Sequence, residues 1–250
     1  MFNTSGKVHH TGVQNEKDTV AIINELNICG ETVAHLGGTK HKADSKGNTT
    51  AQSIKLKQSL NTGSYDYINT SKCNLFGDHF ASFIATVKQY RSLPQSVISD
   101  DTFVTGIREQ FASLCADAID NLTTEQLVSF LTESMITDHS DITHMVITDN
   151  STHKLYVWPP TSHPCVHYLN SGYTPKLVRG KGQSSAKVLF TDNKGTVLDC
   201  GLRLRVTSNN GIKAFLGLSK SNRNSQIVIK LQQDKIHKLM ETVSPTVYTY

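Results

Sequence analysis

Four side chains near the start of the chain could take part in acid, base or metal chemistry: Glu16, Asp44, Ser53 and Lys55. In the segment HKADSKGNTTAQSIKLKQ, Asp44 comes before a turn-rich stretch and Lys55 comes after it. Hydrolysis of a phosphodiester needs a divalent metal, which neutralises the phosphate and acidifies a water, and a cationic group near the attacking hydroxide. Carboxylates that converge with a lysine would supply that set.

A β-hairpin would bring Asp44 and Lys55 together. The sequence predicts that KADS ends one strand, that KGN is the turn and that TAQSIKLK is the second strand. Side-chain alternation gives the second strand two faces, with Ser53, Lys55 and Lys57 on one and Gln52, Ile54 and Leu56 on the other. The peptide carbonyl of Ile54 would be a further metal ligand. A one-residue bulge would exchange Gln52 and Ser53, so both remain candidates for the metal-side position.

A helix is expected to start near Asn15, in NEKDTVAIINEL, because a capping residue and acids precede an apolar stripe. Glu16 would lie in its first turn, and Gly30 would end it. The next segment, ETVAHLGG, is predicted to form a short strand with a Gly37-Gly38 turn. If the hairpin packs on this helix, Glu16 joins the carboxylate of Asp44.

The rest of the chain divides into a helical part and a strand-rich part. Apolar residues recur at three-four spacing between 78 and 140, and Thr123 with Gln126 predicts a capped helix start. After Ser140 the period becomes two in THMVITD, HKLYVWP, AKVLFTD, TVLDCGLRLRVT, IKAFLGL and SQIVIKLQ, and a short closing helix follows in QQDKIHKLMETV. We expect one α/β domain with a catalytic part at 1–77, a helical part at 78–140 and a strand-rich part at 141–250.

Composition narrows the class of protein. The 250 residues include 37% hydrophobic residues, enough for a buried core, and the net charge of +4 is compatible with a polyanionic partner without requiring one. Five widely spaced cysteines in no CxxC pair predict reduced thiols. No signal-peptide run and no stretch of about 18 apolar residues occurs, so we expect a cytoplasmic protein without a membrane partner.

The early residues carry a resemblance to a known family. A Glu in an early helix (GVQNEKD), a Gly-Gly turn, an Asp (GGTKHKAD) and a strand ending in Lys (SIK) together resemble the PD-(D/E)xK nuclease superfamily, and most closely its small type II restriction endonucleases that cut four-base sites. The similarity covers Gly12 to Lys55 and is weaker elsewhere. Two positions differ from the family pattern: Ser53 stands where Glu or Asp is usual, and Ala43 stands where Pro often precedes the Asp.

The resemblance implies a mixed central sheet flanked by helices, and a Mg²⁺-dependent enzyme that hydrolyses double-stranded DNA at specific sequences. It implies that Asp44 is the principal metal ligand, that Glu16 assists, that Ser53 and the Ile54 carbonyl complete the shell, and that Lys55 activates or orients the water. A monomer or homodimer inside a bacterial or viral host cell, with a separately encoded DNA methyltransferase, would follow. The alternatives are a non-catalytic DNA-binding module of the same fold and a structure-specific or nicking nuclease.

With a nuclease expected, several polar and basic segments become candidate DNA contacts. Neutral donors bind phosphate and sugar, and arginine pairs with guanine in the major groove. The candidates beside the catalytic strand and in the loop after it are Gln52, Lys57, Tyr65, Tyr67 and Lys72. The candidates in the basic loop SGYTPKLVRGKGQSSAK and in GLRLRVTSNNG are Lys176, Arg179, Lys181, Arg203, Arg205, Asn209 and Asn210. A solvated loop or an exposed sheet face is the plainer interpretation of each segment.

A second metal site is not expected. His163, Cys165 and His167 alternate in SHPCVH, but zinc sites need a second pair of ligands, so loop packing beside the neighbouring prolines is the favoured interpretation. Cys115 lies in an apolar helical stripe, which favours a place in the core.

Overall fold

The computed structural model describes the backbone of residues 4–37, 42–56, 63–69, 85, 89–90, 92–98, 100–181, 183, 185–208 and 227–250. Within these ranges, side chains are described from Gly12 onward, apart from those of residues 63–69, 206–208 and 227–230 and some within 95–115. The chain forms two compact units, one of residues 1–63, 131–170 and 235–250 and the other of residues 64–130 and 171–234. This division cuts across the three consecutive parts expected from the sequence.

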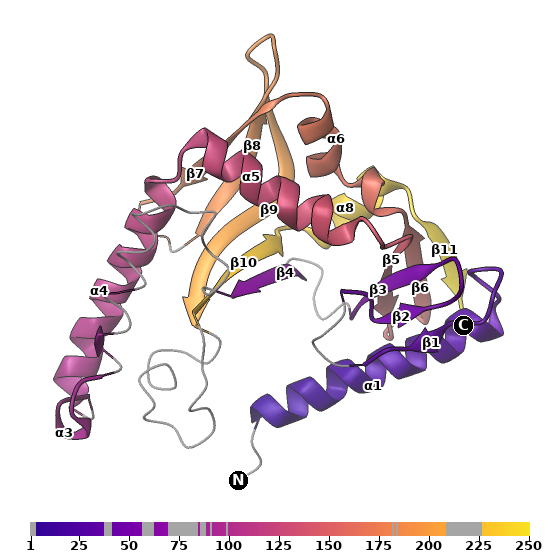
Figure 1. Ribbon diagram of the computed structural model, residues 1–250, viewed down its shortest axis with the longest axis horizontal. Coiled ribbons are helices and arrows are strands. Elements are labelled where there is room, and N and C mark those ends of the chain that lie inside the picture. Colours follow the sequence, from indigo (N-terminus) through magenta and orange to yellow (C-terminus); the bar gives the residue numbers. More distant parts are fainter. Residues whose placement is uncertain are drawn as a thin grey trace. The chain divides into compact units, whose positions relative to one another are not determined.

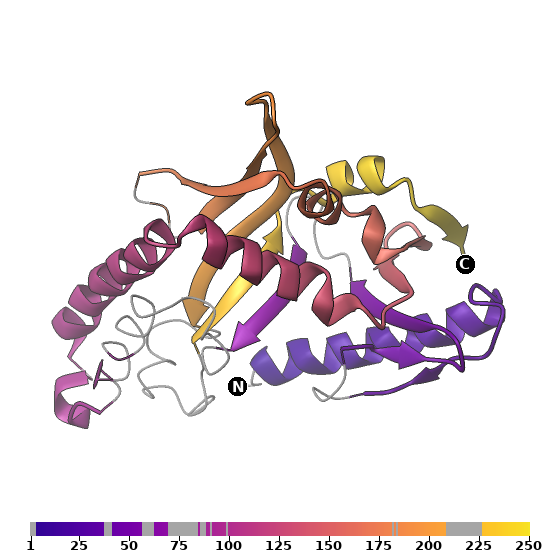
Figure 2. The same ribbon diagram turned by 45° about the horizontal axis from the view of Figure 1, so that its top comes forward.

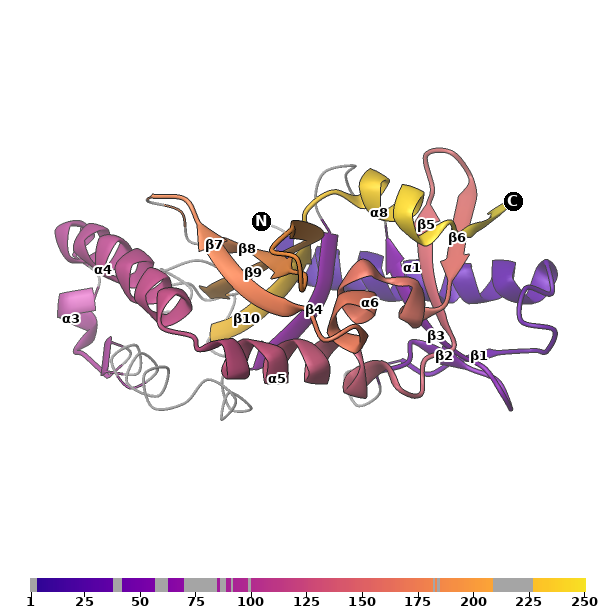
Figure 3. The same ribbon diagram turned by 90° about the horizontal axis from the view of Figure 1, so that it is seen from above.

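The first unit is built on a mixed sheet with the strand order β1-β2-β3-β5-β6-β11 (Figure 1). Its strands are β1 (Ala34–His35), β2 (Ser45–Lys46), β3 (Ala51–Leu56), β5 (His144–Asp149), β6 (Lys154–Trp158) and β11 (Thr246–Thr249). Strands β3 and β5 are parallel, and the other neighbours are antiparallel. The C-terminal segment returns to pair β11 with β6 (Figure 3).

Helices cover both faces of this sheet, α1 (Thr4–Glu25) on one side and α6 (Pro164–Asn170) with α8 (Ile236–Val243) on the other (Figure 1). Val20 and Ile23 of α1 share a buried apolar cluster with Ile54 of β3 and with residues of β5 and β6. Met145 and Trp158, on the other face, are 2% and 3% exposed. Short 3-10 helices lie at Thr137–His139 and Pro160–Ser162. The expected α/β class, a mixed sheet flanked by helices, is confirmed.

Helix α1 is longer at its start than predicted. It begins at Thr4, so Glu16 lies in the middle of the helix and not in its first turn. Asn15 is buried rather than capping the helix. Two glycines, Gly6 and Gly12, interrupt the residues before Asn15, and glycine lowers helix propensity without ending a helix. The helix ends at Glu25, before the predicted stop at Gly30.

The second unit is built on an antiparallel sheet with the strand order β4-β10-β9-β8-β7. Its strands are β4 (Gly63–Asn69), β7 (Thr174–Arg179), β8 (Ser185–Thr191), β9 (Val197–Ser208) and β10 (Ile227–Gln233), and β8 with β9 forms a long hairpin (Figure 2). Helix α4 (Asp101–Asp120) packs against β7, β8 and β9, and α3 (Gln95–Ile98) precedes it. Helix α5 (Thr124–Met135) contributes residues to both units.

Most of the predicted elements in the second half of the chain are confirmed. The Thr123 N–H donates to Gln126 Oε1 at 2.9 Å and the Gln126 N–H donates to Thr123 Oγ1 at 3.2 Å, which is the predicted cap. The prediction of a flexible loop over 171–187 was wrong in part, because Thr174–Arg179 form β7 and pair with β8. Strand β11 was not predicted, and the predicted strand at 212–218 lies outside the described residues. None of the described helices is both long and apolar enough to span a membrane.

Candidate active site

Asp44 and Lys55 meet at the edge of the hairpin, as the sequence predicted. Asp44 Oδ2 accepts the backbone N–H of Ile54 at 2.6 Å and lies 3.4 Å from Lys55 Nζ. The backbone of Asp44 is fixed as well, because its N–H donates to the Gln52 carbonyl at 2.8 Å and its carbonyl accepts the Leu36 N–H at 3.0 Å. Asp44 comes just before β2 in the chain, and its carboxylate accepts the next N–H of β3 that β2 itself does not pair with.

The predicted hairpin forms, with Ser45 opposite Gln52 and Lys46 opposite Ala51, but its turn lies later than the predicted KGN, because Lys46 still belongs to β2. Its turn is closed by the Gly47 N–H, which donates to the Thr50 carbonyl at 2.8 Å. Glu31 lies against this turn and accepts hydrogen bonds from the N–H groups of Asn48, Thr49 and Thr50 and from both threonine hydroxyls. These bonds, led by the one from the Thr50 hydroxyl, lower the pKa of Glu31 to about 2.

Glu31 is a residue that sequence reasoning missed. Its carboxylate occupies the space beside Gly47, where an added Cβ would lie 2.5 Å from Glu31 Cδ. The only sequence signal is an isolated acid, and the turn residues that it binds lie 17 to 19 positions away. We call these hydrogen bonds from residues 48–50 to Glu31 the clamp. The clamp fixes the turn between β2 and β3, and so keeps Asp44, which precedes β2, beside β3.

The structure separates Gln52 from Ser53. Gln52 is completely buried: it accepts the Ser45 hydroxyl at 2.6 Å, and its amide donates to Cys29 Sγ at 3.3 Å. The side chain of Ile54 packs with α1. Ser53 alternates with Gln52 and Ile54 and therefore lies on the Lys55 face, where its side chain is also buried, at 1% exposed. Because the side chain of Gln52 is buried, it cannot make the DNA contact predicted for it.

Glu16 makes a different contact from the one expected. Its Oε2 lies 3.0 Å from Nε2 of His35 in β1, and both side chains are partly buried. Of the described contacts of Glu16, one is with His35 and none is with Asp44 or Lys55. His35 is a second residue that sequence reasoning missed.

The donor atoms around Asp44 fit a Mg²⁺ ion held by few protein ligands. The described contacts engage Asp44 Oδ2 and leave Oδ1, and the side chain is 18% exposed. A residue in a strand directs its N–H and C=O to the same edge, so the Ile54 carbonyl points to the edge at which Asp44 lies. Mg²⁺ binds proteins through one or two carboxylates and keeps several waters. Within the described part of the chain, no group of three or more acidic, histidine or cysteine side chains suits a metal.

The predicted DNA contacts fall into three groups. Lys176, Lys181 and Arg205 are exposed. Arg179 and Arg203 are paired, because Arg179 Nε donates to Asp120 Oδ1 at 3.0 Å and Arg203 Nη2 donates to Asp234 Oδ2 at 3.0 Å. The remaining candidates lie outside the described residues, wholly or in their side chains: Lys57, Tyr65, Tyr67, Lys72, Asn209 and Asn210.

The histidines and cysteine of SHPCVH lie at the start of α6. His163 and Cys165 are completely buried, and His163 Nδ1 accepts the Cys165 N–H at 3.1 Å. His167 is exposed on the helix. Such a buried, hydrogen-bonded histidine is typical of packing. The side chain of Cys115 is outside the described residues.

Comparison of the chain with protein-family models, with curated proteins and with solved structures gave no match. The interpretation of the site therefore depends on its own geometry.

Proposed function

We propose that the protein is a Mg²⁺-dependent DNA endonuclease with a core of the PD-(D/E)xK type, cutting double-stranded DNA at specific sequences. The observation that supports this most is the convergence of Asp44, Lys55 and the backbone of Ile54 on one edge of β3. A Mg²⁺ ion bound by Asp44 would neutralise a phosphate oxygen and acidify a water.

Each residue has its own part in the proposed reaction. The Ile54 N–H orients the Asp44 carboxylate, so Oδ1 is the oxygen available to the metal. The side chain of Lys55 is 40% exposed, and its Nζ lies 3.4 Å from Asp44 Oδ2. Its positive charge would therefore lie beside the phosphate and the attacking water. Ser53 lies on the same face, but its side chain is buried, and Glu16 pairs with His35 rather than with Asp44 or Lys55.

The test is incubation of the purified protein with unmethylated plasmid and viral DNA, with Mg²⁺ and with chelator. We expect discrete Mg²⁺-dependent fragments, and a cleavage rate lowered by about 10²–10⁴-fold in Lys55→Ala. Lys46→Ala is the matched control, because Lys46 is an exposed lysine of the same hairpin that lies opposite Ala51, at the turn end of β3 and away from Lys55 along that strand. Intact DNA under all conditions would contradict the proposal.

One observation favours a second candidate, a non-catalytic DNA-binding module. The site brings together one carboxylate and one lysine, while the other candidate acid, Glu16, pairs with His35. A binding module would retain DNA without cutting it, whatever metal is added. A structure-specific nuclease would instead cut only branched or nicked duplexes in the same assay.

A further inference from the structure

The outer face of the second sheet, which is the face away from α4, is lined with cations. We define the basic face as Lys176 of β7, Lys187 of β8, and Arg203 and Arg205 of β9. The opposite face of the same strands is apolar and buried, with Ala186, Val188, Phe190, Leu202 and Leu204 all at most 1% exposed. Alternation therefore sends every second residue of these strands outward, and the basic residues occupy the outward positions.

The register brings like charges together on this face. Lys187 lies directly opposite Arg203. Like charges at opposite positions destabilise a pair of strands. A sheet that retains them is suited to an anionic partner that offsets the repulsion.

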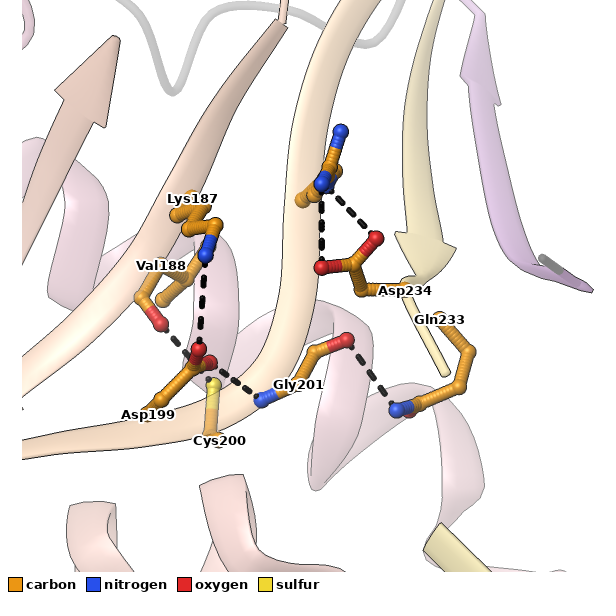
Figure 4. A network of polar contacts seen from close by, with 8 residues as sticks. Lys187, Val188, Asp199, Cys200, Gly201, Gln233 and Asp234 are labelled. Carbon is orange, nitrogen blue, oxygen red and sulfur yellow. Dashed lines mark hydrogen bonds and ion pairs between the residues drawn. The ribbon is translucent and has the colours of Figure 1, made fainter. Parts of the chain in front are cut away.

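Two carboxylates offset the repulsion only in part. Asp234 holds Arg203 through two oxygens, with Arg203 Nε 2.8 Å from Asp234 Oδ1, and Asp199 Oδ2 lies 3.9 Å from Lys187 Nζ (Figure 4). Asp199 is itself held by the bulge in β9, since its Oδ1 accepts the Gly201 N–H at 2.8 Å. In the described part of the chain, Lys176 and Arg205 pair with no carboxylate.

Resting on the proposed function, we infer that the basic face is the surface of the second unit that binds the phosphates of duplex DNA. Lys176 and Arg205 are the unpaired contacts, and Lys187 and Arg203 are oriented by Asp199 and Asp234. Arg179 is not part of this surface: it alternates with the outward Lys176 and Val178 and binds Asp120 at the end of α4. Several cations on one face of a sheet suit the phosphates of a duplex, and sheets dock into duplex grooves in known complexes.

The experiment measures the affinity for a labelled short DNA duplex by fluorescence anisotropy, in chelator so that nothing is cut, over a series of salt concentrations. Each phosphate contact contributes about 0.9 to the slope of log affinity against log salt. We expect Lys176→Gln and Arg205→Gln each to lower the slope by about 0.9, and the double variant by about 1.8. Lys194→Gln, which changes an exposed lysine of the β8–β9 turn, should leave the slope unchanged.

Failure of this inference is distinguishable from failure of the proposed function. A double variant that keeps the wild-type slope would overturn the inference that the basic face binds DNA, even if the protein cuts DNA. A lowered slope in a protein that cuts nothing would support the basic face and overturn the nuclease. Tighter binding of a duplex RNA of the same length than of the DNA would overturn the assignment to DNA.

Discussion

Glu31 Oε1 accepts both the backbone N–H of Thr50, at 2.8 Å, and its hydroxyl, at 2.7 Å, and so fixes the turn between β2 and β3 from outside the hairpin. Hydrogen bonds to the ionised carboxylate hold the pKa of Glu31 at about 2, below its ordinary value of 4.5. A carboxyl group with a lowered pKa in the folded state contributes stability above its unfolded pKa and loses it as the pH falls.

The first prediction follows from the lowered pKa of Glu31. The contribution of Glu31 is complete above pH 4.5 and is lost as the pH falls toward about 2. Glu31→Gln should therefore lower the melting temperature at neutral pH and make it less dependent on pH in the acid range. The measurement is thermal unfolding followed by circular dichroism. Glu25→Gln, at an exposed position, should reproduce the wild-type acid profile; an identical profile for Glu31→Gln would show that the clamp is not formed in solution.

The second prediction concerns Gly47. An alanine Cβ at this position would lie 2.5 Å from Glu31 Cδ, so the carboxylate must leave the turn. Gly47→Ala should lower the melting temperature and the DNA-cleavage rate, and it should add little to the effect of Glu31→Gln, because both remove the same contacts. Gly12→Ala is the matched control: no atom lies within 4 Å of its Cβ position, and in α1 it should gain about 0.5–1 kcal/mol. Additive losses would contradict the shared mechanism.

The third prediction concerns a hydrogen bond between the hydroxyls of Thr19 in α1 and Thr148 in β5. The two oxygens are 2.7 Å apart and both residues are at most 1% exposed. Thr19→Val leaves the Thr148 hydroxyl without this partner and should cost about 1–3 kcal/mol in the free energy of unfolding. The double variant with Thr148→Val should cost less than the sum of the two single changes. Denaturant unfolding measures both, and Thr19→Ser should lose less than Thr19→Val because it keeps the hydroxyl.

The fourth prediction separates Arg179, which is paired with Asp120, from the exposed Lys176 of the same strand. The Arg179 guanidinium lowers the pKa of Asp120 and joins β7 to the end of α4. Arg179→Gln should therefore lower the melting temperature while leaving the salt slope of DNA binding unchanged. Lys176→Gln should show the reverse pattern. A lowered slope in Arg179→Gln, with an unchanged melting temperature, would place Arg179 in the DNA interface.

Local patterns predicted the part of the site that depends on local structure. The turn residues and the alternation of SIKLK identified the hairpin and brought Asp44 to Lys55, because register and side-chain face follow from a period of two. The same alternation could not decide whether Gln52 or Ser53 lies on the metal side, since one bulge would exchange them. What settled their faces was the contact of Gln52 with Ser45 and with Cys29, which lies 23 positions away.

Contacts between distant segments could not be predicted in this way. Arg179 and Asp120 are 59 positions apart, and nothing in the basic segment around Arg179 distinguishes it from Lys176 until β7 is known to be a strand. Glycine and lysine made that segment resemble a loop, although pairing with β8 overrides a weak local preference. The pairing of Glu16 with His35 depends in the same way on where β1 packs on α1.

The last prediction tests the face on which Ser53 lies. Ser53 alternates with Gln52, so its buried side chain is on the same side of β3 as Lys55. Ser53→Asp should add a second carboxylate to that side and lower the Mg²⁺ concentration needed for half-maximal cleavage severalfold, because two carboxylates bind the ion more strongly than one. Gln52→Asp is the matched control, since it places the same charge on the opposite face and breaks the bond to Ser45. It should lower the melting temperature without lowering the Mg²⁺ requirement. A lowered requirement in Gln52→Asp and none in Ser53→Asp would mean that Gln52 is the metal-side residue, through a bulge in β3.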